Sequence, residues 1–124
     1  MADAATLKKV FNPPGLESHY VDAVNMPWEQ LGPGSERKVL YHDPKTGMQT
    51  WLCRIAPGGV IPFHEHPEIE QTYVLEGSFI DDEGECTAGN FVWRPGGSRH
   101  IGRAPNGVLF LAFFMKPSRR LPPE

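Results

Sequence analysis

Proline and glycine punctuate this 124-residue chain so closely that they leave little room for long helices. There are 13 of each, and both tend to end regular elements, because proline lacks an amide hydrogen and glycine favours turns. Short runs rich in β-branched and aromatic residues lie between them, such as residues 48–55 and 108–115. Runs of this kind are typical of strands. The pattern predicts an all-β domain, a sandwich or barrel rather than a parallel α/β sheet.

Charge and composition exclude several classes of protein. A net charge of −3 with no basic stripe argues against nucleic-acid binding. No apolar run approaches the roughly 18 residues of a membrane span, and the N-terminus lacks the apolar core of a signal peptide. Cys53 and Cys86 are isolated, which fits a reduced chain better than a disulfide scaffold. We expect a cytoplasmic protein of one domain, with neither nucleic acid nor membrane as partner.

Three of the five histidines and one glutamate lie in two short segments, in a pattern that suits metal binding. Side chains two residues apart share a face of a strand, so His64 and His66 can converge while Glu65 points outward. After a turn, Glu70 begins a returning strand, and His100 comes from a separate segment. Three imidazoles and one carboxylate suit divalent Fe, Mn, Ni, Cu or Zn. The histidine pair taken alone is as often a surface feature as a metal site.

The spacing of the two segments resembles the cupin superfamily over roughly residues 39–115. The first cupin motif matches at Gly58, His64, His66, Glu70 and Gly77. The second matches at Gly89, Pro95, Gly97 and His100. The resemblance implies a single antiparallel β-barrel, the double-stranded β-helix or jelly roll, with a metal held by His64, His66, Glu70 and His100. One position departs from the pattern: Ala104 stands where the second motif often has an asparagine, which is not a ligand.

A narrower likeness concerns residues 74–100, which are similar to the cupin domain of ChrR-type anti-sigma factors and of many small stand-alone bacterial proteins. Three details carry it: Leu75-Glu76-Gly77, Asp82 with Gly84, and Gly97-Ser98-Arg99-His100. The chain has no room for the zinc-binding, sigma-factor-binding domain that precedes the cupin in those regulators, and it lacks the cysteines of such a domain. We therefore expect a stand-alone protein that binds a small molecule.

The resemblance also suggests how the chain is divided. We expect an irregular N-terminal extension over residues 1–35, the cupin barrel over residues 36–118 and a tail over residues 119–124. Cupins commonly dimerise by pairing barrel edges, often with an N-terminal strand that crosses over, and exposed edges need such cover. The extension is therefore a candidate dimer arm, and a homodimer is expected.

Strand alternation gives a first outline of the pocket wall. Thr72 and Val74 share the parity of Glu70 and should face the cavity. An aromatic side chain in a small barrel more often belongs to the core, and an arginine beside the site more often belongs to a surface pair at the rim. With these alternatives, the candidate pocket residues are Thr72, Val74, Phe79, Trp93 and Arg103.

Two functions of different class are compatible with these ligands. Some related small cupins are dioxygenases that cleave diketone or aromatic carbon bonds, which implies an enzyme with one divalent metal ion per chain. Fe(II) suits that role, with Zn, Ni or Mn as alternatives. No serine or cysteine nucleophile stands beside a base, so no catalytic residue is assigned beyond the metal ligands. The second function is a ligand- or redox-sensing domain of ChrR type with structural zinc, and the same four ligands would serve it.

Overall fold

The protein is built from strands alone in the part of the chain that the computed structural model describes, residues 12–122. The strands are β1 (Glu29–Gly32), β2 (Ser35–His42), β3 (Gln49–Ile55), β4 (Gly59–Glu65), β5 (Glu70–Ile80), β6 (Glu85–Thr87), β7 (Phe91–Arg94), β8 (Arg99–Ala104), β9 (Val108–Phe114) and β10 (Arg119–Arg120). All pairings between them are antiparallel. The predicted all-β class is confirmed. No helix within these residues is long and apolar enough to cross a membrane.

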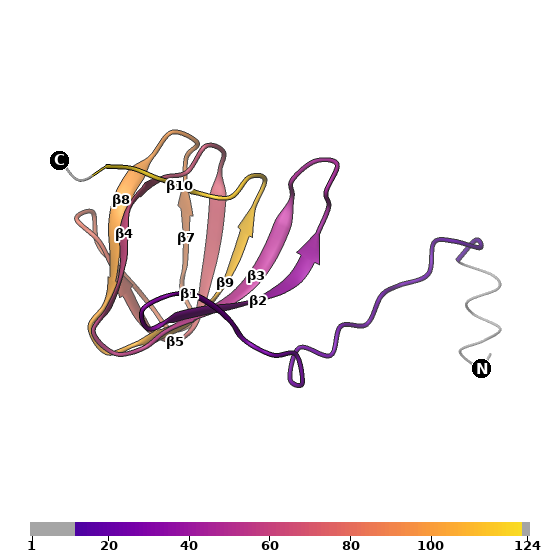
Figure 1. Cartoon of the computed structure of the whole chain (residues 1–124), viewed down its shortest axis with the longest axis horizontal. Coiled ribbons are helices and arrows are strands. Elements are labelled where there is room, and N and C mark those ends of the chain that lie inside the picture. The colour runs from indigo at the N-terminus through magenta and orange to yellow at the C-terminus, as the bar shows by residue number, and fades with distance from the viewer. Residues whose placement is uncertain (1–11, 123–124) are drawn as a thin grey trace.

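Two sheets curl around one interior and share β5. The first sheet has the order β1-β2-β3-β9-β5-β7, and the second contains β10-β4-β8 with β6. The N-terminal part of β5 pairs with β9, whereas Ser78, Phe79 and Ile80 pair with β6. Gly77 allows this change of sheet, because its φ is +74° and an added Cβ would overlap the carbonyl oxygen of Gly107. Figure 1 shows β4 and β8 facing β2, β3 and β9 across the barrel.

The core lies between the sheets and follows the two-residue period of the strands. In β9, Val108, Phe110, Ala112 and Phe114 are all buried. The remaining buried apolar residues come from four other strands, β3, β5, β6 and β8: Cys53, Ile55, Val74, Phe79, Cys86 and Ala104. Phe79 packs against Phe110 with 5.5 Å between the ring centroids. The Phe79 ring also lies 6.1 Å from the ring of His100, centroid to centroid.

The barrel begins earlier and ends later than the sequence suggested. β1 pairs with β2 through Glu29 and Arg37, so ordered pairing starts inside the expected extension of residues 1–35. β10 lies in the expected tail and pairs with β4. Both strands are short and mainly polar, so the apolar runs of the sequence do not predict them. Residues 1–11 of the expected arm lie outside the described residues.

The segment before β1 runs away from the barrel as an extended arm, residues 12–28 (Figure 1). It leaves Leu16, Tyr20 and Val24 strongly exposed, at 68%, 94% and 88%. The end of the arm nearest the barrel is held by Lys38, whose Nζ donates a hydrogen bond to the carbonyl of Ala23 at 2.6 Å. The arm is thus anchored at one end and has apolar side chains without cover along its length.

Candidate metal centre

Three histidines meet inside the barrel although two separate segments supply them. His64 is on β4, His66 follows that strand, and His100 is on β8 directly opposite His64 in the antiparallel pairing. One possible ligand atom from each lies within 4.8 Å of the other two. All three residues are buried, with exposures of 4%, 2% and 8%. The sequence predicted this convergence, and the distances are short enough for one metal ion.

On two of these rings, a hydrogen bond engages Nδ1 and leaves Nε2 free to bind a metal. His64 Nδ1 lies 2.8 Å from the carbonyl oxygen of Pro62, and His100 Nδ1 lies 2.9 Å from Asp81 Oδ2. A carbonyl or carboxylate oxygen can only accept, so both Nδ1 atoms carry the proton and donate it. Each Nε2 then keeps its lone pair. Metal-binding histidines usually donate their other ring nitrogen in this way, which fixes the tautomer and the ring orientation.

The third ring provides the observation that best supports a metal ion. His66 Nε2 is buried and has no hydrogen-bond partner among the described residues. Its Nδ1 lies 3.4 Å from Glu70 Oε2. A buried polar atom without a partner is unfavourable by about 1–3 kcal/mol, and a metal ion would remove that cost. The donor set therefore fits a divalent transition metal bound through imidazole nitrogens.

Glu70 begins β5 and lies beside the histidines without joining their cluster. Its carboxylate contacts His66, and Thr72 Oγ1 donates to Glu70 Oε1 at 3.4 Å. Burial on its own would raise the pKa of Glu70, but the hydrogen bond from His66 and the positive charge of Arg94 outweigh it and hold the pKa below its usual value. The carboxylate is therefore ionised at neutral pH. Its role as a fourth ligand stays a prediction.

The sequence did not reveal the partner of His100. Asp81 Oδ2 accepts hydrogen bonds from His100 and from Arg94 Nη1, the latter at 2.5 Å. Asp81 Oδ1 accepts from the backbone amides of Glu83 and Gly84, at 2.9 and 3.1 Å. The aspartate lies in the run Asp81-Asp82-Glu83-Gly84, which reads as an acidic hairpin turn. The sequence signal for Asp81 is strand alternation: it follows the buried Phe79 by two residues, so both side chains point to the same side.

Burial keeps the rings of His64 and His100 neutral at neutral pH. Burial lowers the pKa of His100 to about 4, and the positive charge of Arg94 acts in the same direction. Burial also lowers the pKa of His64. Asp81 responds oppositely: burial alone would raise its pKa, but the Glu83 amide, His100 and Arg94 together hold it below its usual value. At neutral pH the site therefore has lone pairs ready for a metal and a charged carboxylate behind one of them.

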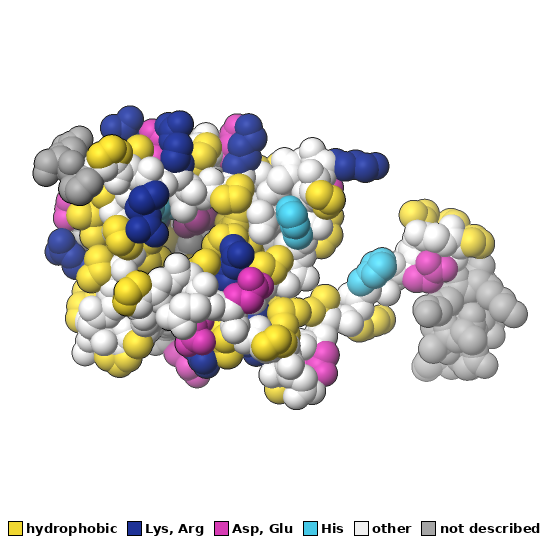
Figure 2. All heavy atoms as spheres, viewed as in Figure 1, with side chains coloured by type: hydrophobic (Ala, Val, Ile, Leu, Met, Phe, Trp, Pro, Cys, Tyr) yellow, Lys and Arg dark blue, Asp and Glu magenta, His cyan; other side chains and the backbone are white. Residues whose placement is uncertain are grey.

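A cavity of about 700 Å³ opens beside the cluster. His64, His100 and Glu70 are among the residues that line it, whereas His66 does not. Most of the wall is apolar, formed by Trp51, Ile55, Ile61, Phe79, Phe110 and Phe114 among others. Figure 2 shows the barrel hollowed on the viewed face, with Lys and Arg side chains around the hollow. The cavity can hold a small organic molecule against the histidines.

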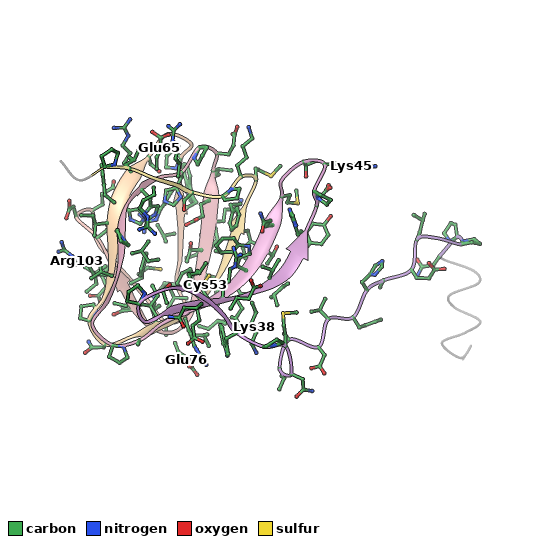
Figure 3. All side chains as sticks on the ribbon, viewed as in Figure 1. Lys38, Lys45, Cys53, Glu65, Glu76 and Arg103 are labelled. Atoms are coloured by element: carbon green, nitrogen blue, oxygen red, sulfur yellow. The ribbon has the colours of Figure 1, made fainter. Side chains whose placement is uncertain are left out.

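The predicted pocket residues fall into three groups. Thr72 and Phe79 line the cavity. Val74 is fully buried in the core and does not reach it. Trp93 and Arg103 lie outside, which corrects their assignment to the pocket: Trp93 pairs with the exposed Gln71 and is 59% exposed, and Arg103 alternates with the inward-facing Gly102 and Ala104. Figure 3 shows Arg103 pointing away from the barrel. The sequence did not give the parity of these two strands.

The outer face of β4, the strand that carries His64, holds a cluster of ion pairs. Glu65, which ends β4 between His64 and His66, accepts hydrogen bonds from Arg99 Nε at 3.1 Å and from Arg119 Nη2 at 2.5 Å. Arg99 belongs to β8 and Arg119 to β10. One carboxylate, visible at the rim in Figure 3, therefore joins three neighbouring strands on the side opposite the histidines.

Comparisons with known proteins agree with this geometry. The chain matches the family described as the ChrR Cupin-like domain over residues 16–118. No curated protein matches the sequence. A structure from Methylibium petroleiphilum PM1, provisionally assigned as an acetylacetone dioxygenase, has a TM-score of 0.80 at 18% identity, with 86% of this chain and 83% of that chain covered. An acetylacetone dioxygenase from Acinetobacter johnsonii has a TM-score of 0.79 at 16% identity, with 90% and 83% covered.

A third structure is a regulator. The anti-sigma factor ChrR of Rhodobacter sphaeroides, solved in complex with SigE, has a TM-score of 0.66 at 26% identity, with 73% of this chain and 50% of that chain covered. At identities below 25%, the two dioxygenase structures establish the fold alone. The family match covers most of the chain and agrees with both motifs and with the antiparallel barrel. The protein therefore belongs to the ChrR cupin-like family and has the cupin jelly-roll fold.

Proposed function

We propose that the protein is a metal-dependent oxygenase that acts on a small organic molecule, of the diketone- or aromatic-cleaving type. The observation that carries this proposal is the position of the histidines. Two of them have available Nε2 atoms and line a largely apolar cavity of about 700 Å³. A metal at this point would face the cavity, so a bound molecule could reach it.

Each part of the chain has a definable task in such a reaction. His64, His66 and His100 would hold the ion, with Glu70 as the predicted fourth ligand. A divalent ion supplies Lewis-acid chemistry and, in the case of Fe(II), redox chemistry with dioxygen. The apolar wall excludes water and orients the bound molecule. Asp81 keeps the His100 ring in place, because its carboxylate is itself fixed by Arg94 and two backbone amides.

The cysteine in the cavity wall is not a competing nucleophile. Cys53 lines the wall, but burial raises the pKa of its thiol to about 12. The thiol is therefore protonated and poorly reactive at neutral pH. Both described cysteines are unpaired, as suits the cytoplasmic location that we propose. The acetylacetone dioxygenases of the same fold support oxygenase chemistry as the first choice of reaction.

A sensory role is the second candidate, and the family match favours it. ChrR belongs to the same family and is an anti-sigma factor. In that case zinc would occupy the histidines without turnover. Structural zinc sites are normally closed by four protein ligands. Here the histidines border a cavity that could admit a further ligand, which is why we place the enzyme first.

Elemental analysis and oxygen uptake test the proposal. Protein purified without chelator should contain about one divalent metal per chain, as the single three-histidine cluster requires. The His64→Ala, His66→Ala double variant should lose the metal, whereas His42→Ala, which removes an exposed histidine on β2, should retain it. Circular dichroism would show whether the double variant folds.

The Fe(II)-loaded protein should then consume oxygen with acetylacetone or catechol, and the double variant should not. Full metal retention in the double variant would overturn the metal centre. Stoichiometric zinc, with no oxygen uptake by the Fe(II)-loaded protein over a panel of diketones and catechols, would overturn the oxygenase and favour the sensor.

A further inference from the structure

β10, the last described strand, places two adjacent arginines beside β4, and their side chains point in opposite directions. β10 pairs with β4 so that Arg119 is opposite Glu65 and Arg120 is opposite His64. Directly opposed residues of an antiparallel pair point to the same face, and successive residues alternate. Arg119 therefore shares the outer face with Glu65, and Arg120 shares the inner face with His64.

The contacts agree with this register. Arg119 donates to the Glu65 carboxylate at 2.5 Å on the outer surface. Arg120 lines the cavity, together with Ser118 from the same segment. The two residues have the same charge, the same side chain and neighbouring positions on one strand. They differ in which side of the barrel they face.

The charges of the cavity wall make Arg120 distinctive. Of the described residues that line the cavity, Arg120 is the one cation and Glu70 the one anion. The Glu70 carboxylate contacts His66 Nδ1 at 3.4 Å. Arg120 is exposed and forms no ion pair among residues 12–122. The rest of the wall is mainly apolar, including Ile55, Phe110 and Phe114.

We propose that Arg120 is a specificity-determining residue that receives the carboxylate of a small, otherwise apolar molecule. The planar guanidinium group matches a carboxylate with two parallel hydrogen bonds. Because Arg120 lies directly opposite His64, the bound carboxylate lies near the histidines, and the apolar body of the molecule extends along the apolar wall of the cavity. This inference rests on the proposed function, because it treats the occupant of the cavity as the substrate. It narrows the substrate class from small organic molecules to organic acids.

Benzoate and benzamide test the inference, because they have nearly the same shape and differ in charge. Binding to the metal-free protein is measured by two-dimensional NMR, with the indole signal of Trp51 reporting from the cavity wall. We expect benzoate to bind more tightly than benzamide. Arg120→Ala should weaken benzoate binding by about fivefold or more, the scale of one partly exposed charge-assisted hydrogen bond. Benzamide binding should not change.

Arg119→Ala is the matched control, since it removes the same charge from the same strand on the outer face. It should leave both affinities unchanged, and Arg120→Lys should restore part of the preference for benzoate. Equal weakening of benzoate by the two alanine variants would show a general surface effect and overturn the inference. Equal weakening of both compounds by Arg120→Ala would show that Arg120 only shapes the rim, and would overturn it too. Unchanged benzoate binding in Arg120→Ala would have the same meaning.

The two proposals can fail separately. Binding to the metal-free protein needs neither metal nor turnover. Selective benzoate binding through Arg120 without oxygen uptake would refute the oxygenase and keep the acid-binding cavity. Oxygen uptake with diketones together with no role for Arg120 in benzoate binding would refute the acid specificity alone.

Discussion

Asp81→Asn is the most informative substitution, because it leaves the predicted ligands intact and changes the group behind one of them. Four donors converge on the two carboxylate oxygens: His100 and Arg94 on one, and the amides of Glu83 and Gly84 on the other. An asparagine has one oxygen and one NH₂ group. Whichever way it turns, one pair of donors faces the NH₂ group, and Arg94 loses its buried counter-charge.

The size of the effect follows from these contacts. The side chains of Asp81 and Arg94 are only 3% and 10% exposed, so solvent screens the lost ion pair weakly. Breaking such a pair and leaving donors unsatisfied should lower the free energy of unfolding by about 2–4 kcal/mol. The variant should still fold, since domains of this kind have about 5–15 kcal/mol in total. Loss of a carboxylate behind a histidine ligand typically weakens metal affinity by about 10- to 100-fold.

Two assays separate these effects. Urea unfolding of the metal-free protein gives the stability change, and competition with a chromophoric zinc chelator gives the affinity. Asp82→Asn is the control, because it removes the same charge at the next, exposed position. It should change stability by no more than about 0.5 kcal/mol. If Asp81→Asn binds zinc as tightly as Asp82→Asn does, the carboxylate does not position His100 and the reasoning fails.

Three further predictions concern acid, packing and assembly. The pKa of His100 is lowered from 6.5 to about 4, so the unfolded chain binds more protons than the folded chain between these values. The stability of the metal-free protein should therefore fall by about 3 kcal/mol as the pH drops through this window, and a flat profile of urea midpoint against pH would contradict this. Gly102→Ala should lower the free energy of unfolding by about 1–3 kcal/mol in urea titrations, because the new Cβ would overlap the Phe79 ring; an unchanged midpoint would count against the packing. We expect a homodimer formed through the exposed arm, which the double variant Tyr20→Asp, Val24→Asp should convert to a monomer in light scattering, and a monomeric parent protein would contradict it.

The sequence predicted the histidine cluster because strand periodicity acts over a few residues. His64 and His66 share a face wherever that strand lies, and the second motif supplies His100. The Asp81–His100 contact could not be predicted in this way. It depends on how the end of β5 is placed relative to β8, which is set by the whole sheet and by the change of sheet at Gly77.

β10 and the orientation of Trp93 show two other limits. β10 consists of Arg119 and Arg120 and has no apolar residue to indicate a strand, so its pairing with β4 becomes visible only in three dimensions. Trp93 is an aromatic strand residue of the kind usually found in a core. The strand register pairs it with the exposed Gln71, and this pairing, not its aromatic ring, places it on the outer face. Hydrophobic content predicts that a strand forms, whereas register decides which side it presents.

The carboxylate of Glu65 gives this barrel a way to be adjusted from its exterior. It joins β4, β8 and β10, the three strands that supply His64, His100 and Arg120. A change on the outer surface that loosens this junction would shift the spacing of the interior groups without replacing any of them. Directed evolution of the protein could therefore alter metal or ligand preference from solvent-facing positions, where sequence changes disturb folding least.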